Sequence, residues 1–173
     1  ALSNGICSLS PNEPRRALSA FISIDKSGNL LGCDLKKTLI ESKVRGVYSE
    51  VNDLFEKGSK SEFFDKYSQL YPDTLPIMEE LYRILAAKSH KRGALELETS
   101  EAKILVDENG IPCDIIKRER GDAEKLIEQF MLAANEGVAN WLHDMSMPCV
   151  YRIHEDPDPD KIHRFAIFAH NLG

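Results

Sequence analysis

The stretch that decides the fold class is residues 17–41, "ALSAFISIDKSGNLLGCDLKKTLIE", in which apolar and polar side chains alternate on both sides of the polar segment 26–29. Alternation with a period of two is typical of a half-buried strand. A short polar segment containing Gly28 between two such runs indicates a tight turn. The sequence therefore predicts a β-hairpin in this region.

A second hairpin is predicted over residues 94–118, "ALELETSEAKILVDENGIPCDIIKR", where the alternation returns. Its turn is expected at Asn109-Gly110, because this dipeptide adopts the positive φ angles that hairpin turns require.

Elsewhere apolar residues recur every three or four positions, which is typical of amphipathic helices. We expect helices from Ser42 to near Gly58, from Asp73 or Thr74 to Gly93, and from an Asp122 cap to about Met145, with a short helix within 59–72. The run "PCVYRIH", 148–154, predicts a buried strand, and "EDPDPDK" begins a final helix. This order favours an α+β fold, a mixed and mainly antiparallel sheet with helices packed against it, in a single unit spanning 1–173.

Composition limits the possible functions. The 173 residues, 42% apolar, are enough for one substantial core, and the net charge of -6 argues against nucleic-acid binding by bulk electrostatics. Four widely spaced cysteines without a CxxC pair are typical of a reduced, cytoplasmic protein. No apolar run reaches the roughly 18 residues of a membrane span, so no membrane partner is expected.

Two side chains allow both a structural and a functional interpretation. Glu128, in "LIEQFMLAAN" (126–135), lies with Asn135 at the border of an apolar helix face, where it is either a solvated edge or a carboxylate directed into a cleft. Tyr48, within the apolar stripe of its helix, either packs in the core or stacks on a ligand. The residues alone leave both questions open.

No active-site motif is visible. The five histidines form no HExxH pattern, and the chain contains no GxSxG, GxGxxG or GxxxxGKS motif, so neither a metal site nor a nucleophile is predicted within it. His154 and Glu155 are adjacent at the end of the predicted strand, and neighbouring residues in a strand point to opposite sides, which excludes a metal-free hydrolase based on that pair.

Four blocks of the sequence resemble the catalytic (RNB) domain of the ribonuclease II and ribonuclease R family, in the family's order and at about its spacing. They are "LSNGICSLSPNE" (2–13), "SKVRGVYSEV" (42–51), "RGALELETSEAKILVDENGIPCDIIKRERGDAEKLIEQFMLAANEGVA" (92–139) and "MPCVYRIHEDPDPDKI" (147–162). The motifs "RGAL", "EAKILVDENG" and "CVYRIHE" are more similar to ribonuclease R.

This resemblance implies a processive 3′→5′ exoribonuclease that uses Mg²⁺ to hydrolyse single-stranded RNA to nucleoside 5′-monophosphates. The family's base-stacking tyrosine falls on Tyr48, and its glutamate that contacts the terminal nucleotide falls on Glu128. Gln129 departs from the second glutamate that is usual there. The RNA-binding residues implied by the resemblance are therefore Tyr48 and Glu128.

The resemblance also implies that the chain is a middle segment of the catalytic domain. The metal-binding aspartates are expected upstream and an arginine-bearing motif downstream, so neither catalytic nor metal-binding residues are expected in the segment, which is predicted to be inactive alone. The alternative is a non-catalytic, RNB-like scaffold or RNA-binding module. Exposed sheet edges also predict some self-association.

Overall fold

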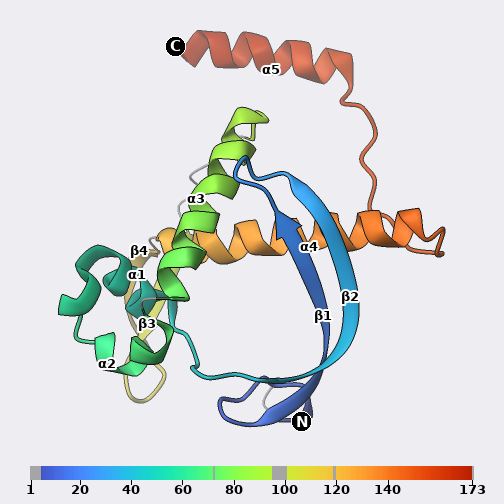
Figure 1. The fold of residues 1–173 in the computed structure, drawn as a ribbon. Coiled ribbons are helices and arrows are strands. Elements are labelled where there is room, and N and C mark those ends of the chain that lie inside the picture. The colour runs from blue at the N-terminus through green and yellow to red at the C-terminus, as the bar shows by residue number, and fades with distance from the viewer. Residues whose placement is uncertain (1–4, 72, 95–100, 119, 173) are drawn as a thin grey trace. The chain divides into compact units, whose positions relative to one another are not determined.

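The structure is a computed structural model that describes residues 5–71, 73–94, 101–118 and 120–172. The chain divides into two compact units, residues 1–141 and 142–173, which are described separately. Figure 1 shows the path of the chain through the helices and strands.

The first unit begins with the predicted long hairpin, formed by antiparallel strands β1 (Pro14–Ile24) and β2 (Leu30–Glu41). Asp25 closes the turn, because its Oδ1 accepts hydrogen bonds from the backbone N–H groups of Ser27 and Asn29, both at 2.8 Å. These bonds, with that of Asn29 the strongest, lower the pKa of Asp25 below its ordinary value. Gly28 has a φ of 80°, which a residue with a side chain rarely adopts.

The second hairpin, β3 (Glu101–Val106) and β4 (Pro112–Arg118), is also as predicted and turns at Gly110, where φ is 78°. Asp107 closes it as Asp25 closes the first, accepting N–H bonds from Asn109 and Ile111 at 2.9 Å. Residues 95–100, part of the predicted alternation, lie outside the described residues. Each described sheet has two antiparallel strands.

Three helices follow the first hairpin, and together they form a hydrophobic cluster. They are α1 (Tyr48–Lys57), α2 (Phe64–Tyr67) and α3 (Leu75–Lys91), with single 3₁₀ turns η2 (Gly58–Lys60) and η3 (Ser68–Leu70) on either side of α2. Leu54, Tyr67 and Leu75 are at most 5% exposed and form the centre of this cluster. The helix expected from Ser42 begins only at Tyr48. Val44 still packs against the cluster, because an apolar side chain can join a core from a segment outside any helix.

Helix α4 (Asp122–Asp144) crosses the long hairpin (Figure 1). At Gly137 the two approach so closely that a Cβ atom would lie 3.3 Å from Cys33 Sγ and 3.4 Å from Ile22 Cδ1. Lys88 of α3 donates to the Gly28 carbonyl of the hairpin turn at 2.9 Å. The helices therefore pack against the antiparallel strands, which confirms the predicted fold class.

The second unit contains the final helix, α5 (Pro159–Leu172), whose start was predicted correctly. Asp158 caps it, because its Oδ1 accepts from the Asp160 N–H at 2.9 Å. The predicted strand at 148–154 is wrong: these residues form no strand and their side chains are exposed, with Val150 at 97%. A strand needs a partner for its backbone groups, and no described residue pairs with this run. In the ranges described, none of the helices combines the length and apolar character needed to cross a membrane.

Candidate functional site

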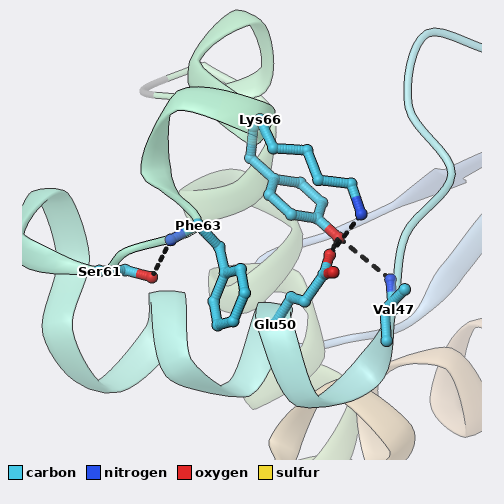
Figure 2. A network of polar contacts seen from close by, with 6 residues as sticks. Val47, Glu50, Ser61, Phe63 and Lys66 are labelled. Atoms are coloured by element: carbon cyan, nitrogen blue, oxygen red, sulfur yellow. Dashed lines mark hydrogen bonds and ion pairs between the residues drawn. The ribbon is translucent and has the colours of Figure 1, made fainter.

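Tyr48 is the first residue of α1, and a hydrogen-bond network around the buried Tyr67 holds the backbone that precedes it. The hydroxyl of Tyr67, a residue only 1% exposed, accepts from the Val47 N–H at 3.1 Å and donates to Glu50 Oε2 at 2.5 Å. Lys66 Nζ donates to the same oxygen at 2.5 Å (Figure 2). Val47 is the N-cap of α1 but has no side-chain cap, so this network fixes the helix start in its place.

The network also determines the ionisation of its members. Hydrogen bonds from the Lys66 ammonium and then from the Tyr67 hydroxyl lower the pKa of Glu50 below its ordinary 4.5. Burial, more than the neighbouring carboxylate, raises the pKa of Tyr67 above its ordinary 10.0. At neutral pH the hydroxyl therefore keeps the proton that it donates to an ionised Glu50.

Glu128 projects from one face of α4 into an open pocket of about 470 Å³. Helix residues three or four positions apart lie on the same face, so successive turns of α4 supply most of its wall. Tyr48, which is 44% exposed, lines the pocket from α1, and Arg120 lines it from the segment before α4. The lining residues are Tyr48, Arg120, Glu124, Ile127, Glu128, Met131, Leu132 and Asn135.

One cationic and two anionic side chains line the pocket. The Arg120 guanidinium donates to the Glu128 carboxylate, and both side chains are 50% exposed. Glu124 adds a second carboxylate, while Ile127 and Met131 provide apolar surface. A site of this composition offers hydrogen-bond acceptors for hydroxyl groups and an aromatic face for a planar ring, with little net attraction for a phosphate.

The two walls of the pocket are joined at the start of α4. Asn52 of α1 accepts from the Ala123 N–H through Oδ1 at 2.8 Å and donates to Glu124 Oε2 through Nδ2 at 2.9 Å. The same Glu124 oxygen accepts from the Gly121 N–H at 3.1 Å. These bonds hold the first turn of α4 against α1.

The structure brings both predicted site residues, Tyr48 and Glu128, to the same pocket. Asn135, recognised in the sequence as lying on the same line of the helix as Glu128, is there too. Sequence reasoning missed Arg120 and Asn52. The only signal for Arg120 was a cation eight residues before Glu128, and nothing in the local sequence indicates that Asn52 contacts a helix about seventy residues later.

Within the ranges that the structure describes, no group of three or more His, Cys, Asp or Glu side chains is placed to hold a metal ion. No chemical step at this pocket is therefore assigned to a metal.

Comparisons of this sequence with known proteins agree on one family. The RNB domain family model matches residues 1–172. Ribonuclease R 1 of Lactococcus lactis subsp. lactis (strain IL1403) is 40% identical over 172 residues, covering 99% of this chain and 21% of that protein. Ribonuclease R of Thermotoga maritima is 39% identical over 173 residues, covering 99% and 24%. The chain thus spans about a fifth to a quarter of these curated relatives.

Solved structures are similar in fold as well as in sequence. Mycoplasma genitalium RNase R in complex with double-stranded RNA matches with a TM-score of 0.86 and 30% identity, covering 99% of this chain and 30% of that one. The same protein in complex with ribose methylated single-stranded RNA matches with a TM-score of 0.81 and 31% identity, covering 94% and 24%.

Proposed function

The chain belongs to the RNB domain family, and from this premise we propose that it forms part of the catalytic domain of a processive 3′→5′ exoribonuclease. Single-stranded RNA is the proposed substrate, and nucleoside 5′-monophosphates are the proposed products. The family match extends across both compact units, which supports a single domain. We assign the Mg²⁺ of the reaction to residues outside this chain, and we expect residues 1–173 alone to be inactive.

The pocket between α1 and α4 is the proposed binding site for one nucleotide of the RNA. The observation that carries this proposal is that Tyr48 and Glu128 line one pocket, although eighty positions separate them in the sequence. Its volume of about 470 Å³ lies within the range of small-ligand sites. A half-exposed tyrosine ring provides a surface on which any base can stack.

Glu128 is the proposed contact to the sugar. An ionised carboxylate only accepts hydrogen bonds, so it binds a ribose hydroxyl well and a phosphate oxygen poorly. Because the 2′-hydroxyl distinguishes RNA from DNA, a carboxylate placed to accept from it would favour RNA. The two acids and one arginine of the pocket suit a sugar better than the charged backbone.

The test compares binding of a short oligoribonucleotide and its deoxy counterpart by a protein that carries residues 1–173 within its complete catalytic domain. Tyr48→Ala should weaken binding of both by about 1–3 kcal/mol, the typical contribution of one stacked base. Glu128→Ala should lower the preference for RNA. Glu136→Ala is the matched control, because Glu136 lies on the same helix, is also 50% exposed and also pairs with an arginine, Arg92. Unchanged binding in both pocket variants would refute the proposal.

A second experiment tests whether residues 1–173 can catalyse the reaction alone. Residues 1–173 alone should give no Mg²⁺-dependent shortening of a labelled single-stranded RNA. Stepwise shortening that Glu128→Ala abolishes would show that the chemistry lies within this chain.

We also propose that the isolated chain self-associates through its strand edges. Within the described residues, β1 and β2 pair only with each other, and Leu18 and Leu39 on them are each 71% exposed. A single monomeric species in light scattering over a wide concentration range would contradict this.

A further inference from the structure

We infer that Asn52 is a positioning residue of the pocket, because its side-chain amide fixes the wall that carries Glu128 relative to the wall that carries Tyr48. The inference rests on the proposed function of the pocket as a nucleotide site. Asn52 is not among the residues that line the pocket, so any role in binding is indirect.

The position of the contact follows from helix periodicity. Asn52 comes four residues after Tyr48 in α1, and Glu124 comes four residues before Glu128 in α4. Residues four apart lie on the same helix face, one turn from each other. The 2.9 Å hydrogen bond between Asn52 and Glu124 therefore lies one turn away from each of the two proposed RNA contacts.

Helix α4 depends on this contact because it lacks a side-chain cap of its own. Gly121 occupies the N-cap position, and its carbonyl accepts the first helical hydrogen bond, from the Lys125 N–H at 3.3 Å. Glu124, at the third helical position, reaches back to the Gly121 N–H at 3.1 Å, which is one half of a capping box. The other half needs a side-chain oxygen at the N-cap, which glycine does not have.

Asn52 supplies that oxygen from another helix. Its Oδ1 accepts from the Ala123 N–H at 2.8 Å, so a donor at the start of α4 that would otherwise lack a partner is satisfied. The amide also occupies the space of the missing side chain. A Cβ atom on Gly121 would lie 2.3 Å from Asn52 Nδ2 and 2.5 Å from Oδ1.

Glycine is needed at position 121 for space and not for backbone conformation, since Gly121 is not among the residues with positive φ. Asn52 and Gly121 thus form a matched pair, in which the cap comes from α1 only because position 121 leaves room for it. A cap within α4 would stabilise the helix equally but would leave it unattached to α1. The same amide therefore caps α4 and fixes its position relative to α1. Specific recognition requires the side chains of a binding site to be held in a defined geometry.

The experiment separates capping from positioning with two variants of a protein that carries residues 1–173 within its complete catalytic domain. Asn52→Ala/Gly121→Ser removes the link but gives α4 its own N-cap oxygen. Asn52→Asp keeps an acceptor for the Ala123 N–H but places a carboxylate against Glu124 in place of a donor. Thermal stability and the ratio of affinities for an oligoribonucleotide and its deoxy counterpart are measured for each.

Asn52→Ala/Gly121→Ser should keep most of the stability that Asn52→Ala alone loses, whereas Asn52→Asp also carries the repulsion between its carboxylate and Glu124. Both variants should lower the affinity ratio by about tenfold, as a displaced contact group does. Leu85→Ala is the control for stability, because Leu85 is buried in α3 and does not line the pocket. Its affinity ratio should match that of the wild type at a temperature where all variants are folded.

An affinity ratio within twofold of the wild type in either link variant would overturn the inference, and so would an equal loss of the ratio in Leu85→Ala. The Glu128→Ala variant distinguishes this failure from failure of the proposed function. If Glu128→Ala lowers the ratio and the Asn52 variants do not, only the positioning role is wrong. If Glu128→Ala leaves the ratio unchanged, the pocket is not the sugar-recognition site.

Discussion

Replacing Tyr67 with phenylalanine removes one oxygen atom from the network that holds the start of α1. The ring is 1% exposed and packs in the core with Leu54 and Leu75, and Phe keeps that packing. The change deletes the acceptor for the Val47 N–H, at 3.1 Å, and the donor to Glu50, at 2.5 Å. Only hydrogen bonding is therefore perturbed.

The free-energy cost of Tyr67→Phe arises from the Val47 N–H, which loses its acceptor. Leaving a buried N–H without a partner costs about 1–3 kcal/mol, and we expect about 1.5 kcal/mol, in the lower half of that range, because Val47 itself is 42% exposed and its bond to Tyr67 is only partly buried. No contribution is assigned to Glu50, which keeps its bond to Lys66. Because about 1.4 kcal/mol corresponds to a factor of ten, the Val47 amide should exchange its hydrogen about tenfold faster.

The assay is amide hydrogen exchange followed at Val47 by NMR, or by mass spectrometry on a peptide that contains it. Tyr71→Phe is the matched control: within the described part of the chain its hydroxyl makes no hydrogen bond, and its edge contact with the Phe64 ring is retained. Exchange at Val47 that is equally fast in wild type and Tyr67→Phe would refute the view that this hydroxyl secures the helix start beside Tyr48.

Three further predictions concern single residues. The pKa of Glu50 is lowered from 4.5, so the ionised carboxylate contributes stability above pH 4.5 that is lost as the pH falls through the pKa of the folded state. The difference in unfolding free energy between wild type and Glu50→Gln should therefore shrink in acid, and a constant difference would contradict this. Gly121→Ala should destabilise the protein by about 1–3 kcal/mol in urea unfolding, since the new methyl overlaps the capping amide; unchanged stability would show that the amide can move aside. Arg120→Ala should change stability by less than about 1 kcal/mol, as expected of a half-exposed ion pair, but should lower the preference for RNA because Glu128 loses its partner. Arg92→Ala is the control, and equal effects of the two arginine variants on RNA preference would refute a specific role for Arg120.

The hairpins were predictable because their signals are local. Both turns carry an aspartate whose carboxylate binds the next N–H groups and a glycine with positive φ, and these features are readable over five residues. The end of α1 at Gly58 and the end of α3 before Gly93 were readable for the same reason.

The errors arose where distant residues determine the local structure. The helix predicted from Ser42 begins at Tyr48, because Val47 is extended and bonded to Tyr67, twenty positions later. The cap predicted at Asp122 is instead supplied by Asn52, and Asp122 is the first helical residue. The apolar run 148–154 looked like a buried strand, but a pattern of side chains does not provide a neighbouring strand.

The candidate site was only partly predictable. Helix periodicity placed Glu128 and Asn135 on one line of α4, and family resemblance selected Tyr48 and Glu128 from many similar residues. That the two share a pocket depends on how α1 lies against α4, and the hydrogen bond that joins these helices runs between Asn52 and Glu124, which no local pattern connects.

The central claim is that Tyr48 and Glu128 contact the same ribonucleotide. The most direct test is a crystal structure of a complete catalytic domain carrying this chain, bound to a short oligoribonucleotide. We predict that one base stacks on the Tyr48 ring and that a ribose hydroxyl of the same nucleotide lies within hydrogen-bond distance of the Glu128 carboxylate. RNA bound elsewhere, with the pocket between α1 and α4 left empty, would contradict the account.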